Sequence, residues 1–239
     1  MKHLSMLTKR WLIAGLLVVA LCVGSVGTAQ AVVIDRDGTL PAGEVVDDDL
    51  VLTANTVLVE GTVNGTLIAA GQSITINGTI KSDAILAAEN VLIGEKALIE
   101  GNIFTAGGDV VVRGKVLGSL FGASSTLTLA EGSSLGRNLY YAGYQVEAKA
   151  GSTVTRDINA AGYQFVLGGS CRHLDLAVGE MELTGKVSGN AVLYLGQMDD
   201  SARDYRPWFS GMRLPPALPV GLRISAGAVI SGKLTYTSS

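Results

Sequence analysis

The sequence is poor in cysteine, proline, aromatic residues and charge. Its 239 residues include 2 Cys and 5 Pro, and 5% are aromatic. Charged residues make up 16% of the chain, against roughly 25% in an average domain. Cys171 is the only cysteine beyond residue 31, so that part of the chain can form no internal disulfide. An apolar core and backbone hydrogen bonds must therefore hold the fold together.

Glycine and small or β-branched apolar residues are abundant instead. The chain has 31 Gly, and Val, Leu, Ile and Ala supply most of its 48% hydrophobic residues. This balance favours tightly coiled strands over helices.

The first 31 residues have the character of an export signal. Three basic residues lie within the first ten positions, and residues 11–27 are apolar and uncharged. Ala29-Gln30-Ala31 then gives the small-x-small pattern that precedes signal cleavage. We predict a signal peptide over 1–31 and an extracytoplasmic protein, secreted or in the cell envelope. An uncleaved N-terminal membrane anchor is the alternative, and it would be the chain's only contact with a membrane.

The remaining chain is acidic. Without the three leading basic residues it has 15 basic and 21 acidic residues, a formal net charge of −6, and no basic run. By charge alone, nucleic acid and anionic membrane surfaces are therefore poor partners, and we expect no nucleic-acid binding.

A repeat of about 17 residues dominates the sequence. The stretch from Val57 to Ser73 is followed by a second copy from Ile74 to Asn90. The later copies begin at Val91, Val110, Leu127, Val146, Phe165 and Met181, and a final copy begins near Leu222. Such a period is typical of a solenoid, in which each unit buries its apolar face against its neighbours.

Side-chain parity indicates that each copy is strand. In the first copy the apolar and glycine residues occupy odd positions, and in the second they occupy even positions. Alternation with period two marks strand, and an odd repeat length requires the parity to flip if one column always points inward. We therefore predict an all-β fold, a single-stranded parallel β-helix of nine to ten coils. Stacking at about 4.8 Å per coil gives roughly 45 Å of length.

Glycines and length changes are expected at the corners of the coils. Recurring glycines such as Gly61, Gly78, Gly114 and Gly118 fit positions that need a positive φ or a close backbone approach. Copies of 19 residues should bulge at one corner.

Two segments depart from the repeat. Residues 32–56 are acidic and loosely periodic and are predicted to cap the first coil, before repeats over 57–197. Residues 198–221 form a loop with four of the five prolines, which either folds against the β-helix or presents Tyr205, Trp208 and Phe209 to a partner. Residues 222–239 form the final coil, which has no recognisable cap and therefore an edge open to stacking.

Two outward columns are predicted on one face. One holds apolar and aromatic residues over five successive copies: Ile68, Ile85, Phe104, Phe121 and Tyr140. The column two places on is alanine in seven copies, from Ala70 to Ala177. Contiguous exposed apolar surface usually marks an interface, so this face is expected to pack against another copy, the envelope or the 198–221 loop.

No pattern in the sequence indicates a catalytic residue, a metal or a cofactor. Ser134 lies in a G-x-S-x-G match, but repeat strand surrounds it instead of the strand and helix that a nucleophile elbow needs. Cys171, His173 and Asp175 alternate and are predicted to lie outward on one strand, as a polar edge more than a metal site.

The repeat units resemble those of the bactofilins, the polymer-forming cytoskeletal proteins. The resemblance rests on the form V-x-V-x-G-x-V-x-G-x-L at Val57–Leu67, Val110–Leu120 and Met181–Ala191, and covers about residues 50–197 and 222–239. It implies a right-handed, three-sided β-helix that polymerises end to end without nucleotide and scaffolds envelope processes. Typical bactofilins are cytoplasmic, so the signal peptide is a departure that shifts the expected role to the envelope.

These observations predict a non-enzymatic scaffold of the cell envelope that assembles with itself through its ends or its flat apolar face. Partners besides a second copy would be the cell wall or envelope proteins. The alternative is a binding module for cell-wall glycan or a surface partner. An enzyme on a β-helix, such as a polysaccharide lyase or an acyltransferase, would need a cleft of paired acids or a catalytic histidine, and neither is recognisable.

Overall fold

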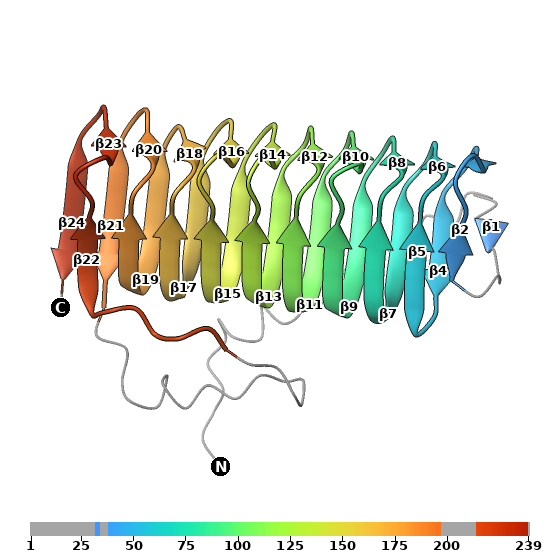
Figure 1. The fold of residues 1–239 in the computed structure, drawn as a ribbon, viewed down its shortest axis with the longest axis horizontal. Helices are drawn as coiled ribbons and strands as arrows, with labels where there is room; N and C mark the ends of the chain where they lie inside the picture. The colour runs from blue at the N-terminus through green and yellow to red at the C-terminus, as the bar shows by residue number, and fades with distance from the viewer. Residues whose placement is uncertain (1–31, 34–37, 197–213, 239) are drawn as a thin grey trace, which may run out of the picture. The chain divides into compact units, whose positions relative to one another are not determined.

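The computed structural model describes residues 32–33, 38–196 and 214–238. The predicted signal peptide lies outside this range, as do Tyr205, Trp208 and Phe209. The part from Val32 to Ser239 is one compact unit. It is an all-β parallel solenoid with about 17 residues per turn, as the repeat predicts (Figure 1).

Each coil has three straight runs of strand, which we call the first, second and third sides. They are separate strands in the second coil: β4 (Leu50–Thr53), β5 (Thr56–Val59) and β6 (Thr62–Val63). From the third coil onward, the first and second sides join into one bent strand of ten residues. These are β7 (Leu67–Ile76), β9 (Ala84–Ile93), β11 (Ile103–Val112), β13 (Leu120–Leu129), β15 (Leu139–Ala148), β17 (Ile158–Leu167) and β19 (Leu174–Leu183).

The third side consists of strands of two residues that stack into a ten-stranded sheet. Besides β6 they are β3 (Val45–Val46), β8 (Thr79–Ile80), β10 (Leu98–Ile99), β12 (Lys115–Val116), β14 (Ser134–Leu135), β16 (Thr153–Val154), β18 (Ser170–Cys171), β20 (Lys186–Val187) and β23 (Val229–Ile230). The remaining strands belong to the end coils: β1 (Val32–Val33), β2 (Thr39–Leu40), β21 (Ala191–Leu195), β22 (Gly221–Ile224) and β24 (Leu234–Ser238).

Strand pairing reproduces the repeat register from the sequence. Val57 pairs with Ile74, and the same column continues through the first residue of every predicted copy to Met181 and Leu222. The inward residues of this column are 0–2% exposed from Val57 to Met181. The parity argument is therefore confirmed.

The predicted cap over 32–56 already contributes strands to the solenoid. Strand β2 pairs with β5, β3 with β6, and β1 with β4, all in parallel. Leu40, Leu50 and Leu52 from this segment are 0–1% exposed and belong to the core.

The extra residues of the longer copies lie at one corner, between the second and third sides. There a four-residue turn is closed by a backbone hydrogen bond, as from the Ala97 N–H to the Gly94 carbonyl at 3.0 Å and from Ser152 to Lys149 at 3.0 Å. In shorter copies, such as Ile76 to Ile80, the chain takes this corner without the turn. The predicted bulge at one corner is confirmed.

Most of the recurring glycines serve close packing. A Cβ on Gly78 would lie 2.0 Å from the Gly61 carbonyl oxygen of the coil before it, and one on Gly118 would lie 2.2 Å from the Gly101 oxygen. A positive φ occurs elsewhere, for example at Gly132 in a bulged turn (φ 79°). Of the two roles expected for the recurring glycines, the close approach is the one these positions need.

A polar ladder, which sequence reasoning missed, lies at the corner between the third and first sides. Here one side chain accepts the backbone N–H of the equivalent residue in the next coil. Asp83 Oδ1 accepts from Asn102 N at 2.7 Å, Asn102 Oδ1 from Ser119 N at 2.9 Å, and His173 Nδ1 from Asn190 N at 2.9 Å. The ladder satisfies donors that the turn would otherwise leave without a partner.

Candidate interaction face

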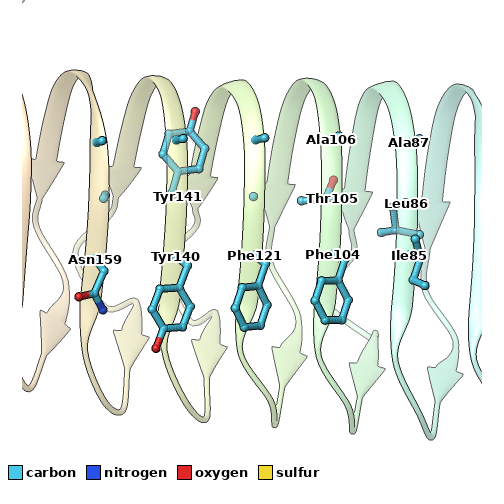
Figure 2. A pocket seen from close by; sticks show the side chains of 15 residues that line it. Ile85, Leu86, Ala87, Phe104, Thr105, Ala106, Phe121, Tyr140, Tyr141 and Asn159 are labelled. Atoms are coloured by element: carbon cyan, nitrogen blue, oxygen red, sulfur yellow. The ribbon is translucent and has the colours of Figure 1, made fainter. Parts of the chain in front are cut away.

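The first side presents the two outward columns that the sequence predicts. Strand pairing aligns Ile68, Ile85, Phe104, Phe121 and Tyr140 in one row, which we call the ridge. Their exposures lie between 37% and 43%. Figure 2 shows Phe104, Phe121 and Tyr140 side by side on three neighbouring coils.

The ridge aromatic rings stack face to face. The centroids of Phe104 and Phe121 are 5.0 Å apart with 7° between the ring planes, and those of Phe121 and Tyr140 are 4.9 Å apart with 13°. The coil spacing of about 4.8 Å produces this contact directly, because equivalent side chains project in parallel from adjacent strands. The inner ring faces are covered by one another, so the ridge presents mainly ring edges to solvent.

A row of exposed alanines lies beside the ridge. We call Ala87, Ala106, Ala123, Ala142 and Ala161 the ledge; strand pairing aligns them in this order. Ridge and ledge line a shallow groove of about 730 Å³ across five coils, and none of its 15 lining residues is charged. A second hollow, of about 600 Å³, lies at the corner on the far side of the ledge, where Gly71, Gly107 and Gly143 keep the surface low.

Inward residues support this face from below. Tyr141 is 5% exposed, and its hydroxyl donates to the Ser124 carbonyl at 2.7 Å. It stacks above Gly122, where a Cβ would already lie 3.2 Å from the Tyr141 ring. A large inward residue in one coil is therefore matched by a glycine in the coil before it.

A buried polar cluster lies farther along, beyond the corner. Tyr144 and Tyr163 are 8% and 6% exposed and stack at 4.9 Å. The Tyr163 hydroxyl donates to Glu180 Oε1 at 3.3 Å. Burial raises the pKa of Tyr144, and the nearby Tyr163 and Glu180 raise it further.

The chain that returns from the predicted loop is held by Gln164, the residue after Tyr163. Gln164 Nε2 donates to the Pro216 carbonyl at 3.1 Å, and its Oε1 accepts from Leu218 N at 2.9 Å. Gln164 is 2% exposed, so these bonds fix residues 216–218 against the second side. No sequence pattern predicts this contact, because it joins positions 52 and 54 residues apart.

The predicted polar edge at Cys171, His173 and Asp175 is wrong in two respects. Cys171 is 5% exposed, belongs to the core and lies on β18, whereas Asp175 lies on β19. Burial raises the pKa of the Cys171 thiol to about 12, with a smaller contribution from Asp157. Parity gave the wrong side for Cys171 because the chain turns a corner at residues 172–173, between β18 and β19. His173 serves the polar ladder.

Other chemistry is sparse in the described chain. Ser134 lies on β14, on the third side, and follows the bulged turn at Gly132. Over residues 32–33, 38–196 and 214–238, no three His, Cys, Asp or Glu side chains cluster in a way that could hold a metal ion. None of these residues forms a helix long and apolar enough to span a membrane.

One charged pair stands out beside the polar ladder. The Arg172 guanidinium binds the Asp157 carboxylate through two hydrogen bonds of 2.9 Å. The hydrogen bonds from Arg172 hold the pKa of Asp157 below its usual value.

Comparison of the chain with models of known protein families, with curated proteins and with solved structures finds no match. Any inference about the function of this chain therefore rests on its fold and its exposed surfaces.

Proposed function

We propose that this chain is a non-enzymatic structural protein of the cell envelope that assembles with itself through the open end of its solenoid. The observation that supports it is the exposure of core positions in the last described coil. Tyr236 pairs with Leu193, and Ile224 pairs with Leu183. Leu193 and Leu183 are 1% and 0% exposed, whereas Tyr236 and Ile224 are 60% and 47% exposed.

The two ends of the solenoid differ. At the N-terminal end, Leu40 and Val46 point inward and are only 1% and 6% exposed. At the other end, β24 is the last strand of its sheet, so one edge of its backbone has no partner strand within the described chain. An edge strand beside exposed apolar side chains is a template for pairing with another strand.

This asymmetry favours contact between two C-terminal coils. Such a contact relates the copies by a two-fold axis and brings their β24 strands together in antiparallel fashion, a geometry that backbone hydrogen bonds accommodate well. Burying Tyr236, Ile224 and their neighbours removes apolar surface from water at about 25 cal/mol per Å².

Two sequence features support the wider role. The resemblance to bactofilins favours a scaffold that forms through β-helix ends. The signal-like residues 1–31 favour a location outside the cytoplasm, with the cell wall or envelope proteins as further partners.

The alternative role, a binding module for cell-wall glycan, has less support. Sugars stack on aromatic ring faces, and the inner faces of Phe104, Phe121 and Tyr140 are covered by one another.

The test is the mass of the purified protein in solution, measured by sedimentation velocity over a range of concentrations. We expect association in the unchanged protein and its loss at the end contact in Tyr236→Glu, since the carboxylate would be buried without a partner. Thr237→Glu is the matched control, because it puts the same charge on the same strand but on its outward face. Equal masses for the two variants would contradict the proposal.

A further inference from the structure

The ridge and ledge together form one contiguous apolar patch on the first side. From the exposure of their side chains, the patch amounts to roughly 600 Å², at the upper end of what a typical monomer exposes. No charged residue lines the groove between them, so the face offers nothing to a charged ligand.

The shape of this face is complementary to itself: the ridge protrudes, and the small side chains of the ledge leave room for the ridge of a second copy. The ridge and the groove run parallel to each other across the same coils (Figure 2). The three stacked rings centre on Phe121, and the ledge centres on Ala123 of the same coil. A two-fold axis that lies in the interface, parallel to the solenoid axis and midway between the two rows, would place the ridge of each copy over the ledge of the other and leave the two solenoids parallel.

The size of the patch also fits a second copy. Two such faces bury roughly 1,200 Å² in total, which reaches the lower limit of specific protein interfaces. The contact would use parallel-sided solenoids, so it needs no change in backbone shape.

We propose that a second copy of this chain packs on this face side by side, with the two solenoids parallel and the ridge of each copy over the ledge of the other. This deepens the self-assembly proposed above and uses a separate surface. The end contact alone joins two copies, and the side contact joins such pairs into a larger assembly.

A charge-complementation experiment tests the contact between ridge and ledge. All proteins carry Tyr236→Glu, which removes the end contact and leaves the side contact as the only one measured. Phe121→Lys and Ala123→Glu are then added separately. Each charge would be buried without a partner in a homodimer, so we expect each variant to dimerise about 100-fold more weakly, equivalent to about 2.8 kcal/mol.

An equal mixture of the two variants should regain dimerisation. In the mixed pair, the lysine introduced on the ridge of one copy would face the glutamate introduced on the ledge of the other across one half of the contact. The unchanged Phe121 and Ala123 would face each other across the other half. The expected result is a heterodimer in sedimentation velocity, with tenfold or greater recovery over either variant alone.

Leu117→Lys is the matched control, because Leu117 is 52% exposed and lies next to β12 on the third side. It should dimerise as the Tyr236→Glu protein does, and circular dichroism should show that every variant keeps its strand content.

Three results would overturn the proposal: a monomeric Tyr236→Glu protein, unimpaired single variants, or a mixture that stays monomeric. The last would mean that something other than a second copy, such as residues 197–213 or a lipid, occupies the face. If Tyr236→Glu instead leaves the mass of the unchanged protein as it was, the end contact fails and the side contact stands.

Discussion

Replacing Gly118 by alanine should separate two coils of the solenoid. The new Cβ would lie 2.2 Å from the Gly101 carbonyl oxygen and 2.6 Å from its carbonyl carbon, both in the backbone of the coil below. Ordinary contacts of this kind are about 1 Å longer, and a strand ladder cannot open by that amount without stretching its hydrogen bonds. Overpacking of this kind typically costs about 1–3 kcal/mol, and we expect the upper end because the clash is with backbone on a rigid ladder.

Thermal unfolding followed by far-ultraviolet circular dichroism measures this effect. For a protein of this size, 1 kcal/mol shifts the Tm by about 2–4 °C, so Gly118→Ala should lower it by roughly 6–12 °C. Protein concentration must be held constant, since the proposed self-association would raise the Tm.

Two other glycines provide the comparison. Gly132 has a φ of 79° and no atom within 4 Å of its would-be Cβ, so Gly132→Ala should cost only the left-handed strain, about 1–2 kcal/mol. Gly227 has open space and no positive φ, so Gly227→Ala should leave the Tm unchanged or raise it slightly. A Gly118→Ala protein that melts like Gly227→Ala would refute the close-packing explanation.

Three further outcomes follow from the structure. Asn102→Ala should cost about 1–3 kcal/mol in urea unfolding, because the Ser119 N–H loses its acceptor at a partly buried corner. Arg172→Gln should lower the Tm at neutral pH and have less effect as the pH falls below about 4. The reason is that the pKa of Asp157 is lower in the folded than in the unfolded state. The stabilisation by the ion pair is therefore present above the unfolded pKa and is lost on acidification. Cys171 should resist iodoacetamide at pH 8 in the folded protein and react after unfolding, as peptide mass spectrometry would show.

Each of these has a clear contrary result. For the ladder, Glu100→Ala is an exposed neighbour expected to change stability by less than about 0.5 kcal/mol, so equal effects at Asn102 and Glu100 would count against it. A stability difference for Arg172→Gln that grows on acidification would reverse the assigned sign. Rapid native labelling of Cys171 would contradict its place in the core.

The sequence predicted the fold well because the repeat is local and regular. Val57, Ile74 and Val91 each begin a copy, and strand pairing joins them in that register. The ridge followed from the same alignment, because equivalent positions in a solenoid are neighbours in space.

The errors lie at the corners. Side chains alternate between inside and outside only along a straight strand. The corner between β18 and β19 breaks the alternation, so Cys171 points into the core although Asp175, four residues on, is exposed. The polar ladder at Asp83 and Asn102 was visible as a column of Asp, Asn and Ser, but its role depends on backbone donors that only the folded corner presents.

Contacts between distant segments were beyond sequence reasoning. The bonds from Gln164 to Pro216 and Leu218 depend on the path of a chain that leaves the repeat, and no periodicity describes such a path. The predicted roles of Tyr205, Trp208 and Phe209 stay predictions, since these residues lie outside the described part of the chain.

The central claim is self-assembly through the open C-terminal coil, and sedimentation velocity of the purified protein beside Tyr236→Glu and Thr237→Glu tests it most directly. The proposal predicts that the unchanged protein and Thr237→Glu form the same large species and that Tyr236→Glu forms a smaller one. A single monomeric species for all three proteins at every concentration would contradict it.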